Sequence, residues 1–202
     1  MVKIALCGAS GSGKSTIARW MSEKYNLPYL ENSAGLILPH EVQQRFVDHY
    51  GWTKSGHSDV IRLGNINPNF AVDFQQELLK VRSKFIRDTP DFIFDRSPVD
   101  NLAYFLLQCG HLASPEVTHQ HIVRCLEAIT PISLVIFLHT STEPGNVENN
   151  GSRVANWSYQ KMVTAVFKHV LEFYMPQVPR LELSMWDYAT RQRLISNYME
   201  NK

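Results

Sequence analysis

Short apolar runs alternate along the chain with stretches in which apolar residues recur every three or four positions. Five runs rich in strand-forming residues predict β-strands over 2–7, 29–31, 92–94, 132–138 and 180–184. The amphipathic stretches predict helices over 15–25, 39–50, 69–86, 98–109, 115–129, 156–174 and 186–198. Residues 51–68 show no clear period, and no element is predicted there. Strands that alternate with helices in this way are typical of a parallel sheet with right-handed crossovers.

Several predicted elements have recognisable ends. Pro39 opens one helix and Gly51 stops it. Before another helix, Ser97 as N-cap is followed by Pro98 and, three residues beyond the cap, by Asp100, which together form a capping box. The strand over 132–138 is apolar almost throughout. Such a strand is expected in the middle of a parallel sheet that helices cover on both faces.

The segment between the first strand and the first helix is rich in glycine. It reads Gly8, Ala9, Ser10, Gly11, Ser12, Gly13, Lys14, Ser15 and Thr16. This sequence fits the phosphate-binding pattern G-x-x-x-x-G-K-S/T, in which backbone N–H groups point at phosphate oxygens at the start of a helix. Lys14 is expected to reach the β- and γ-phosphates of ATP, and Ser15 to bind Mg²⁺. The alternative is a glycine-serine turn that carries a lysine by chance. The strand before the loop and the helix after it make this alternative less favoured.

Asp95 and Arg96 directly follow the strand over 92–94. Because the carboxyl ends of parallel strands meet at one edge of the sheet, both residues are expected beside the phosphate loop. Asp95 can hold a water of the Mg²⁺ shell or accept a proton from an acceptor hydroxyl, and Arg96 can bind an acceptor phosphate. Glu31, at the end of the second strand, is the alternative base, and the sequence does not decide between them. An ion pair that only fixes the turn is the alternative to both roles.

A polar loop rich in glycine and asparagine follows the strand over 132–138. A loop of this length in a compact domain is more often a lid or a binding loop than a plain connection. Arg153 lies at its far end, where it is expected to meet the charge that develops between donor and acceptor. The sequence therefore predicts a lid over about 140–155.

The composition favours one globular domain over residues 1–202. Lys and Arg number 20 and Asp and Glu 19, a net charge of +1, so no broad basic surface and no nucleic-acid partner are expected. No apolar run approaches the length of a membrane span, and the N-terminus reads as a strand, so a cytoplasmic protein is expected. The cysteines Cys7, Cys109 and Cys125 have no paired spacing and are expected in the core.

Gly8 to Thr16, the Asp95-Arg96-Ser97 stretch and Asn150-Gly151-Ser152-Arg153 together resemble the nucleoside and nucleotide kinase branch of the P-loop NTPases. That branch includes thymidylate kinases and phage deoxynucleoside monophosphate kinases. The resemblance implies a three-layer α/β P-loop fold with a central parallel five-stranded sheet, helices on both faces and a lid loop. It further implies ATP and Mg²⁺ as cofactors, and it places the acceptor-binding region at about residues 31–86.

The resemblance also implies roles for particular residues. The Asp-Arg-Ser stretch is expected to bind the acceptor nucleotide and a water molecule of the metal ion. Ser15 and Asp95 are the residues expected to bind the metal. The helix over 69–86 is similar in placement to one whose glutamine reads the acceptor base. Its Gln75 and Arg82 are seven residues apart and hence on one face. Gln75, or its neighbour Gln76, is therefore a base-reading candidate, and a polar residue flanking a core helix is the alternative.

The sequence leaves the acceptor open. Some thymidylate kinases carry an arginine in the phosphate loop and nucleotide kinase lids often carry several, whereas this loop has none and this lid only Arg153. A deoxynucleoside monophosphate is the expected acceptor, and a nucleoside or a hydroxymethylated base in DNA is the alternative. An NTP-hydrolysing switch or motor is less favoured, because the N-K-x-D and L-S-G-G-Q motifs are absent. The helices over 69–86 and 98–109 are candidates for a homodimer face.

Overall fold

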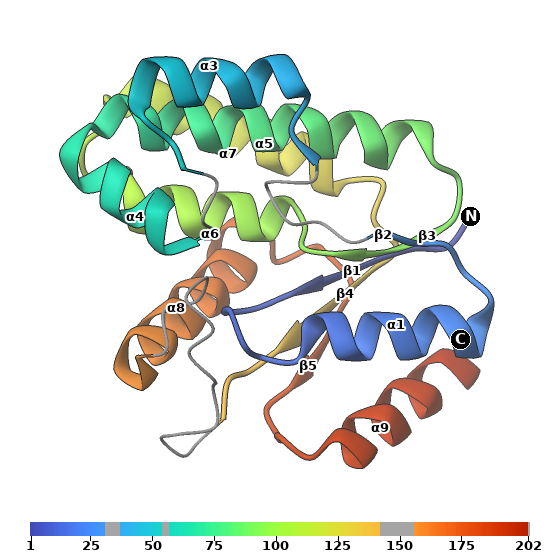
Figure 1. Cartoon of the computed structure of the whole chain (residues 1–202). Helices are drawn as coiled ribbons and strands as arrows, with labels where there is room; N and C mark the ends of the chain where they lie inside the picture. Colours follow the sequence, from blue (N-terminus) through green and yellow to red (C-terminus); the bar gives the residue numbers. More distant parts are fainter. Residues whose placement is uncertain (31–36, 54–56, 142–155, 202) are drawn as a thin grey trace.

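The computed structural model describes residues 1–30, 37–53, 57–141 and 156–201, and its centre is a parallel five-stranded sheet (Figure 1). The strands are β1 (Lys3–Cys7), β2 (Tyr29–Leu30), β3 (Phe92–Asp95), β4 (Leu134–Leu138) and β5 (Arg180–Leu183). Their order is β2-β3-β1-β4-β5, and every neighbouring pair is parallel. The predicted fold class is confirmed. Because β1 lies between β3 and β4, the winding of the chain reverses beside the end of β1, where ligands of such sheets bind.

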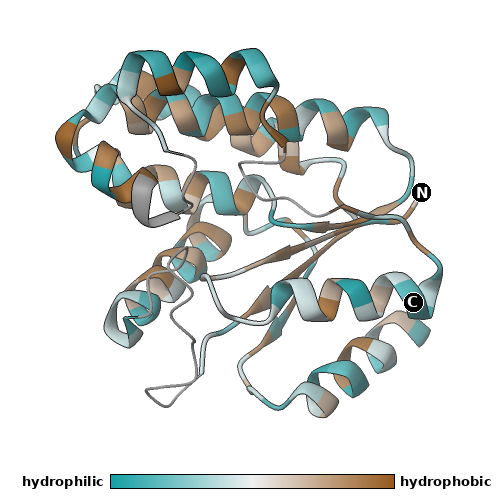
Figure 2. Cartoon of the chain, in the orientation of Figure 1, coloured by the Kyte–Doolittle hydropathy of each residue, from teal (hydrophilic) through white to brown (hydrophobic). Residues whose placement is uncertain are grey.

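Helices cover both faces of this sheet. They are α1 (Lys14–Tyr25), α3 (His40–Tyr50), α4 (His57–Ile66), α5 (Pro68–Asp88), α6 (Pro98–Gln108), α7 (Pro115–Ile129), α8 (Trp157–His169) and α9 (Tyr188–Glu200). Side chains alternate between the faces of a strand. Ile4 and Leu6 accordingly pack with residues of α1 and α9, whereas Ala5 and Cys7 pack with residues of α6, α7 and α8. Figure 2 shows the resulting apolar strands between two layers of helices.

The segment for which the sequence predicted no element contains helix α4. Its Val60 and Leu63 are buried in an apolar cluster with Phe70 and Phe74 of α5. Gly64 allows the close approach of the two helices, because a Cβ atom there would lie 3.2 Å from the Cβ atom of Ala71. Glycine and asparagine are poor helix formers, so the helix depends on packing against α5 that local sequence does not reveal.

Most predicted helix boundaries agree with the structure. Helix α7 has the predicted bounds, and Gly51 ends α3 with a φ of 68°. Helix α6 begins at Pro98 with the predicted capping box, in which the Ser97 Oγ accepts from the Val99 N–H and the Asp100 carboxylate from the Ser97 N–H. The long predicted helix over 156–174 is divided into α8 and a π-helical segment, Val170–Tyr174.

Within the described ranges, every helix is too short or too polar to cross a membrane.

Candidate active site

The glycine-rich loop joins the end of β1 to the start of α1, as the sequence predicts. Gly8, Gly11 and Gly13 have φ values of 138°, 81° and 89°, which side chains disfavour. At Gly8 the restriction is also steric, since a Cβ atom there would lie 2.3 Å from the carbonyl oxygen of Leu138. The loop therefore passes against the end of β4 and leads into the start of α1, where the free N–H groups of a helix N-terminus favour phosphate.

The ammonium group of Lys14 lies within this loop. Its Nζ donates to the carbonyl oxygens of Gly8 at 2.9 Å and of Ala9 at 2.8 Å, and the residue is 6% exposed. Burial, with the nearby Arg96 guanidinium, lowers the pKa of Lys14. A desolvated cation held against loop carbonyls gains interaction energy when an anion enters the same space. Lys14 is thus placed to bind a phosphate group.

Ser15 and Asp95, the two predicted metal residues, lie side by side. The Ser15 Oγ donates a hydrogen bond to Asp95 Oδ2, which joins the start of α1 to the end of β3. Asp95 Oδ1 is buried and has no hydrogen-bond partner among the described residues. Hydroxyl and carboxylate oxygens are the ligands that Mg²⁺ prefers, directly or through water. The pair therefore fits a magnesium ion, for which the unpartnered oxygen supplies a free acceptor.

Arg96 adopts an unusual backbone conformation beside this pair. Its φ is 93°, in the left-handed region that disfavours side chains, and its N–H donates to the Leu6 carbonyl oxygen at 3.0 Å. The guanidinium lies 5.7 Å from the centre of the Tyr104 ring and donates a hydrogen bond to that hydroxyl. Burial lowers the pKa of Arg96, but Tyr104, Asp100 and Asp95 outweigh it, so the pKa lies above its ordinary value. Arg96 is a permanent cation at this edge.

Tyr104 was not singled out by the sequence, yet it links two parts of the site. It is 5% exposed, and its hydroxyl hydrogen-bonds both the Arg96 guanidinium and the backbone of Ser10 in the glycine-rich loop. Burial raises the pKa of Tyr104, so it stays a neutral phenol at physiological pH. Its position one turn beyond Asp100 on α6 is the signal that could have identified it.

Asp100 also does more than cap a helix. It is fully buried, and Oδ1 has no partner within the described part of the chain. Burial raises the pKa of Asp100, although Arg96, Lys14 and Arg82 act to lower it. The sequence predicts only its capping contact. The structure adds a carboxylate among three cations at the centre of the site.

Gln75 and Arg82, the predicted acceptor residues, meet at Asn101 of α6. The Asn101 Nδ2 donates to Gln75 Oε1 at 3.3 Å, and the Arg82 Nη1 donates to Asn101 Oδ1 at 2.5 Å. All three side chains are buried, and burial lowers the pKa of Arg82 to about 10. Gln75 also donates to Gln108 Oε1 at 2.9 Å. These residues form a polar cluster inside the helical layer, and Asn101 is the member that the sequence did not reveal.

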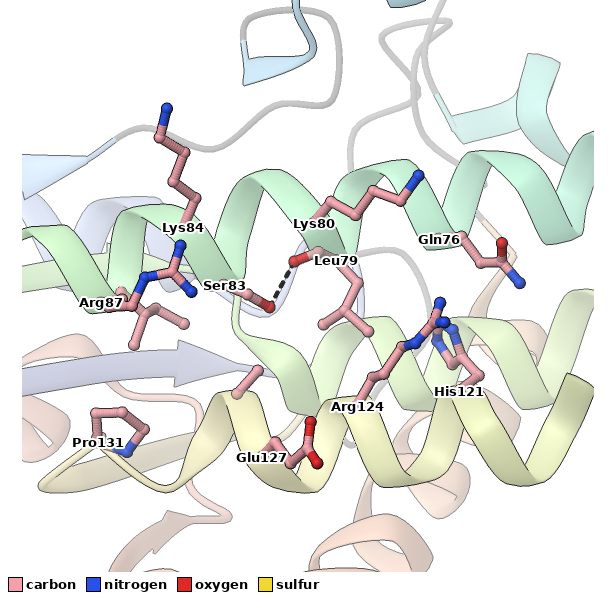
Figure 3. A pocket seen from close by; sticks show the side chains of 12 residues that line it. Gln76, Leu79, Lys80, Ser83, Lys84, Arg87, His121, Arg124, Glu127 and Pro131 are labelled. Carbon is pink, nitrogen blue, oxygen red and sulfur yellow. Dashed lines mark hydrogen bonds between the residues drawn. The ribbon is translucent and has the colours of Figure 1, made fainter.

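The neighbouring glutamine lies on another side of α5. A groove of about 430 Å³ lies between α5 and α7, and Gln76 lines it together with Lys80, Lys84 and Arg124 (Figure 3). The Asn101 cluster instead lies between α5 and α6. Of the two base-reading candidates, the structure therefore places only Gln75 with Arg82.

Two predicted catalytic residues fall outside the described residues. Glu31, the alternative base, and Arg153, together with the lid that carries it, belong to 31–36 and 142–155. The site described here is accordingly the loop, the end of β3 and the polar cluster of α5 and α6.

A family model described as an AAA domain matches residues 3–177, most of the chain. The chain belongs to the AAA domain family. The match includes the glycine-rich loop, Asp95 and the Asn101 cluster. The predicted P-loop family is thereby confirmed. No curated protein sequence matches the chain.

Solved structures share the fold of this AAA domain protein. A deoxyadenosine kinase from M. mycoides with products dCMP and a flexible dCDP bound is 17% identical, with a TM-score of 0.68 over 99% of each chain. The same kinase with bound dCTP is 19% identical, with a TM-score of 0.67 over the full length of both. The YorR protein of Bacillus subtilis, in complex with phosphorylated GDP, is 15% identical, with a TM-score of 0.53 over 98% of this chain and 96% of that one. At these identities the likeness concerns the fold.

Proposed function

We propose that this protein is an ATP- and Mg²⁺-dependent kinase that transfers the γ-phosphate of ATP to a (deoxy)nucleoside or its monophosphate. The observation that carries the proposal is the hydrogen bond between Ser15 and Asp95. It joins a phosphate-binding loop to a carboxylate at the end of β3, where parallel sheets bind ligands. A phosphate loop alone would serve a motor or a switch equally well. Motors and switches also hold Mg²⁺ with such a carboxylate, so the features that favour transfer to a second substrate are Arg96 beside this pair and the buried polar cluster of Gln75, Arg82 and Asn101.

The donor side follows from the loop. Its backbone N–H groups and Lys14 would hold the β- and γ-phosphates of ATP. Ser15, with Asp95 directly or through water, would hold Mg²⁺, and the ion when bound neutralises charge on the phosphate oxygens. Lys14 already lies within the loop, so little side-chain rearrangement is needed for it to meet a phosphate. The loop thus binds and orients the donor.

The acceptor side is formed by Asp95, Arg96 and the cluster of Gln75, Arg82 and Asn101. Asp95 would take the proton of the acceptor hydroxyl or orient it toward the γ-phosphate. Amide and guanidinium groups provide donors and acceptors in a fixed pattern, which suits the edge of a nucleobase. The Asn101 contact also connects that pattern to α6, the helix that begins two residues after Arg96. The two ends of a nucleoside could therefore be held by one rigid element.

The charges favour a nucleoside over a monophosphate as the acceptor. Three cations act on Asp100 in the described part of the chain, namely Lys14, Arg82 and Arg96. Lys14 belongs to the donor loop and Arg82 is bound to Asn101. Of these three described cations, Arg96 alone is then left for an acceptor phosphate, whose charge of about −2 one arginine offsets only in part. The structural likeness to a deoxyadenosine kinase supports the same choice.

A transfer assay tests the proposal. The protein is incubated with γ-labelled ATP, Mg²⁺, a panel of nucleosides and nucleoside monophosphates, and DNA that contains hydroxymethylated bases. Label in a nucleoside monophosphate is the expected result. Label in a diphosphate would assign the monophosphate as acceptor, and label only in DNA would refute a small-molecule kinase. Release of inorganic phosphate without any acceptor would indicate the second candidate, an NTP-hydrolysing switch or motor, which the AAA domain match keeps open.

The Arg96→Ala variant distinguishes the two small acceptors. If Arg96 binds an acceptor phosphate, the KM for that acceptor should rise about tenfold to a hundredfold, because a charge-assisted contact is lost. With a nucleoside acceptor, kcat should fall instead and the KM for the acceptor should change less. Arg87→Ala is the matched control, since Arg87 is exposed and pairs only with Asp88 among the described residues. A rise in the KM for ATP alone would place Arg96 on the donor instead.

A further inference from the structure

Arg191 of α9 reaches across the molecule to the glycine-rich loop. Its Nη1 donates to the Ser12 carbonyl oxygen at 2.5 Å, its Nη2 to the His139 carbonyl oxygen at 2.7 Å and its Nε to the Met185 carbonyl oxygen at 2.7 Å. These oxygens belong to three separate segments: the loop itself, the residue after β4 and the residues after β5. The residue is 2% exposed. One guanidinium therefore holds together the backbone around the phosphate-binding loop.

Among the described residues, no carboxylate forms an ion pair with this guanidinium. Its three hydrogen-bond acceptors are neutral carbonyl groups, and the face of the Trp186 ring lies 5.1 Å from the guanidinium carbon. Burial lowers the pKa of Arg191 to about 10, so it stays charged at neutral pH. A buried charge without an opposite charge is costly, and proteins rarely keep one without a use. An anion that binds nearby would supply the missing partner.

The charge is also close to where phosphate binds. A Cβ atom on Gly13 would lie 3.2 Å from Arg191 Nη1, so the guanidinium lies against the loop at the residue before Lys14. Its hydrogen bond to the Ser12 carbonyl oxygen fixes the orientation of the peptide unit between Ser12 and Gly13. The Gly13 N–H belongs to the same planar unit and is therefore fixed as well. Arg191 thus affects both the backbone conformation of the loop and the electrostatic potential at it.

We propose that Arg191 is a positioning residue for the phosphate donor. It orders the glycine-rich loop through Ser12 and adds positive potential behind it, without contacting the nucleotide. The proposal rests on the donor half of the proposed function, namely that this loop binds the phosphates of a nucleotide. It does not depend on which acceptor is used. The competing explanation is that Arg191 only attaches α9 to the sheet.

The test compares three variants. Arg191→Met removes the charge and the donors but keeps an apolar stem, and Arg191→Lys keeps the charge with fewer, differently placed donors. Arg180→Met is the matched control: Arg180 is a partly buried arginine of β5 that also donates to a backbone carbonyl, that of Leu171 at 2.9 Å. Binding of ATP, ADP and inorganic tripolyphosphate is measured by calorimetry, and Tm by thermal unfolding. Tripolyphosphate is included because it has no base or sugar and reports on the loop alone.

We expect Arg191→Met to weaken tripolyphosphate and ATP binding about tenfold to a hundredfold, the range for lost contacts of a charged group. Arg191→Lys should recover part of the loss, and Arg180→Met should bind all three ligands as the parent protein does. A lower Tm for Arg191→Met with unchanged affinity for tripolyphosphate would refute the proposal in favour of a structural role. If Arg191→Met does not fold, Arg191→Gln, which removes the charge and keeps an amide donor, replaces it, and parent-like binding of tripolyphosphate by that variant would refute the positioning role. Failure of the parent protein to bind any of these ligands would refute the proposed function itself.

Discussion

Replacing Lys14 by alanine is expected to lower kcat for every acceptor by about a hundredfold to a thousandfold. This is the range for removing one group that stabilises charge in a transition state. The loss has a direct structural cause: Lys14 is 6% exposed and its ammonium lies within the glycine-rich loop, 2.8 Å from the Ala9 carbonyl oxygen. Without it, the glycine-rich loop offers only its backbone N–H groups to offset the charge on the transferred group. Steady-state kinetics with saturating ATP and acceptor measure the effect.

Two controls make this result specific to Lys14. Lys168→Ala removes an exposed lysine of α8 that pairs with Glu172 at 3.8 Å, and it should leave kcat unchanged. Thermal unfolding of Lys14→Ala should show a Tm near that of the parent protein, because the cost of burying the ammonium group is removed together with its hydrogen bonds to the loop carbonyls. Turnover by Lys14→Ala within a fewfold of the parent rate would exclude Lys14 from phosphoryl transfer.

The sheet could be predicted from the sequence because its signals are local. The strand over 132–138 is apolar almost throughout, and the structure places β4 beside β1 with helices on both faces. The start of α6 could be predicted because a capping box is a pattern of four consecutive residues. Helix α4 could not be predicted, since its stability depends on contacts of Val60 and Leu63 with the aromatic residues of α5.

The difference between local sequence signals and long-range contacts also explains which residues of the site could be predicted. The glycine-rich loop is one continuous motif, and Asp95 and Arg96 follow directly from the end of a strand. Asn101 and Arg191 were missed, because their importance comes from partners far along the chain. Arg191 is 179 residues from Ser12, whose carbonyl oxygen it binds. A single sequence contains no local signal for such a contact, which only the packing of α9 against the sheet creates.

The missed residues also show how the proposed site is supported. Tyr104 hydrogen-bonds Arg96 and the backbone of Ser10, and Arg191 holds Ser12 from the other side. The glycine-rich loop is thus held by side chains of α6 and α9, which lie on opposite faces of the sheet. A loop that must wrap closely around phosphate gains affinity when its conformation is fixed before binding. The pair of Tyr104 and Arg96 thereby links the glycine-rich loop to the end of β3.

Asp95→Asn should lower kcat by about a hundredfold to ten-thousandfold, the range for loss of a general base. Asparagine has nearly the same shape and can still accept the hydrogen bond from Ser15, so the loop should keep its structure. It cannot take a proton from an acceptor hydroxyl, and as a neutral group it binds a metal or its waters less well. A Mg²⁺ titration of kcat should therefore also shift to higher concentration, and chelation with EDTA should abolish the activity of the parent protein.

The control for this variant lies at the other end of the same strand. Asp91 precedes β3, is partly exposed and accepts from the Val2 N–H at 2.5 Å, so Asp91→Asn removes a carboxylate that is distant from the glycine-rich loop. Its kcat and Mg²⁺ dependence should match those of the parent protein. If Asp95 only fixed the turn after β3, Asp95→Asn would change the Tm and leave kcat and the Mg²⁺ titration as they were. A loss of kcat at unchanged Tm is the outcome that the unpartnered Oδ1 of Asp95 leads us to expect, because that oxygen has no structural contact to lose among the described residues.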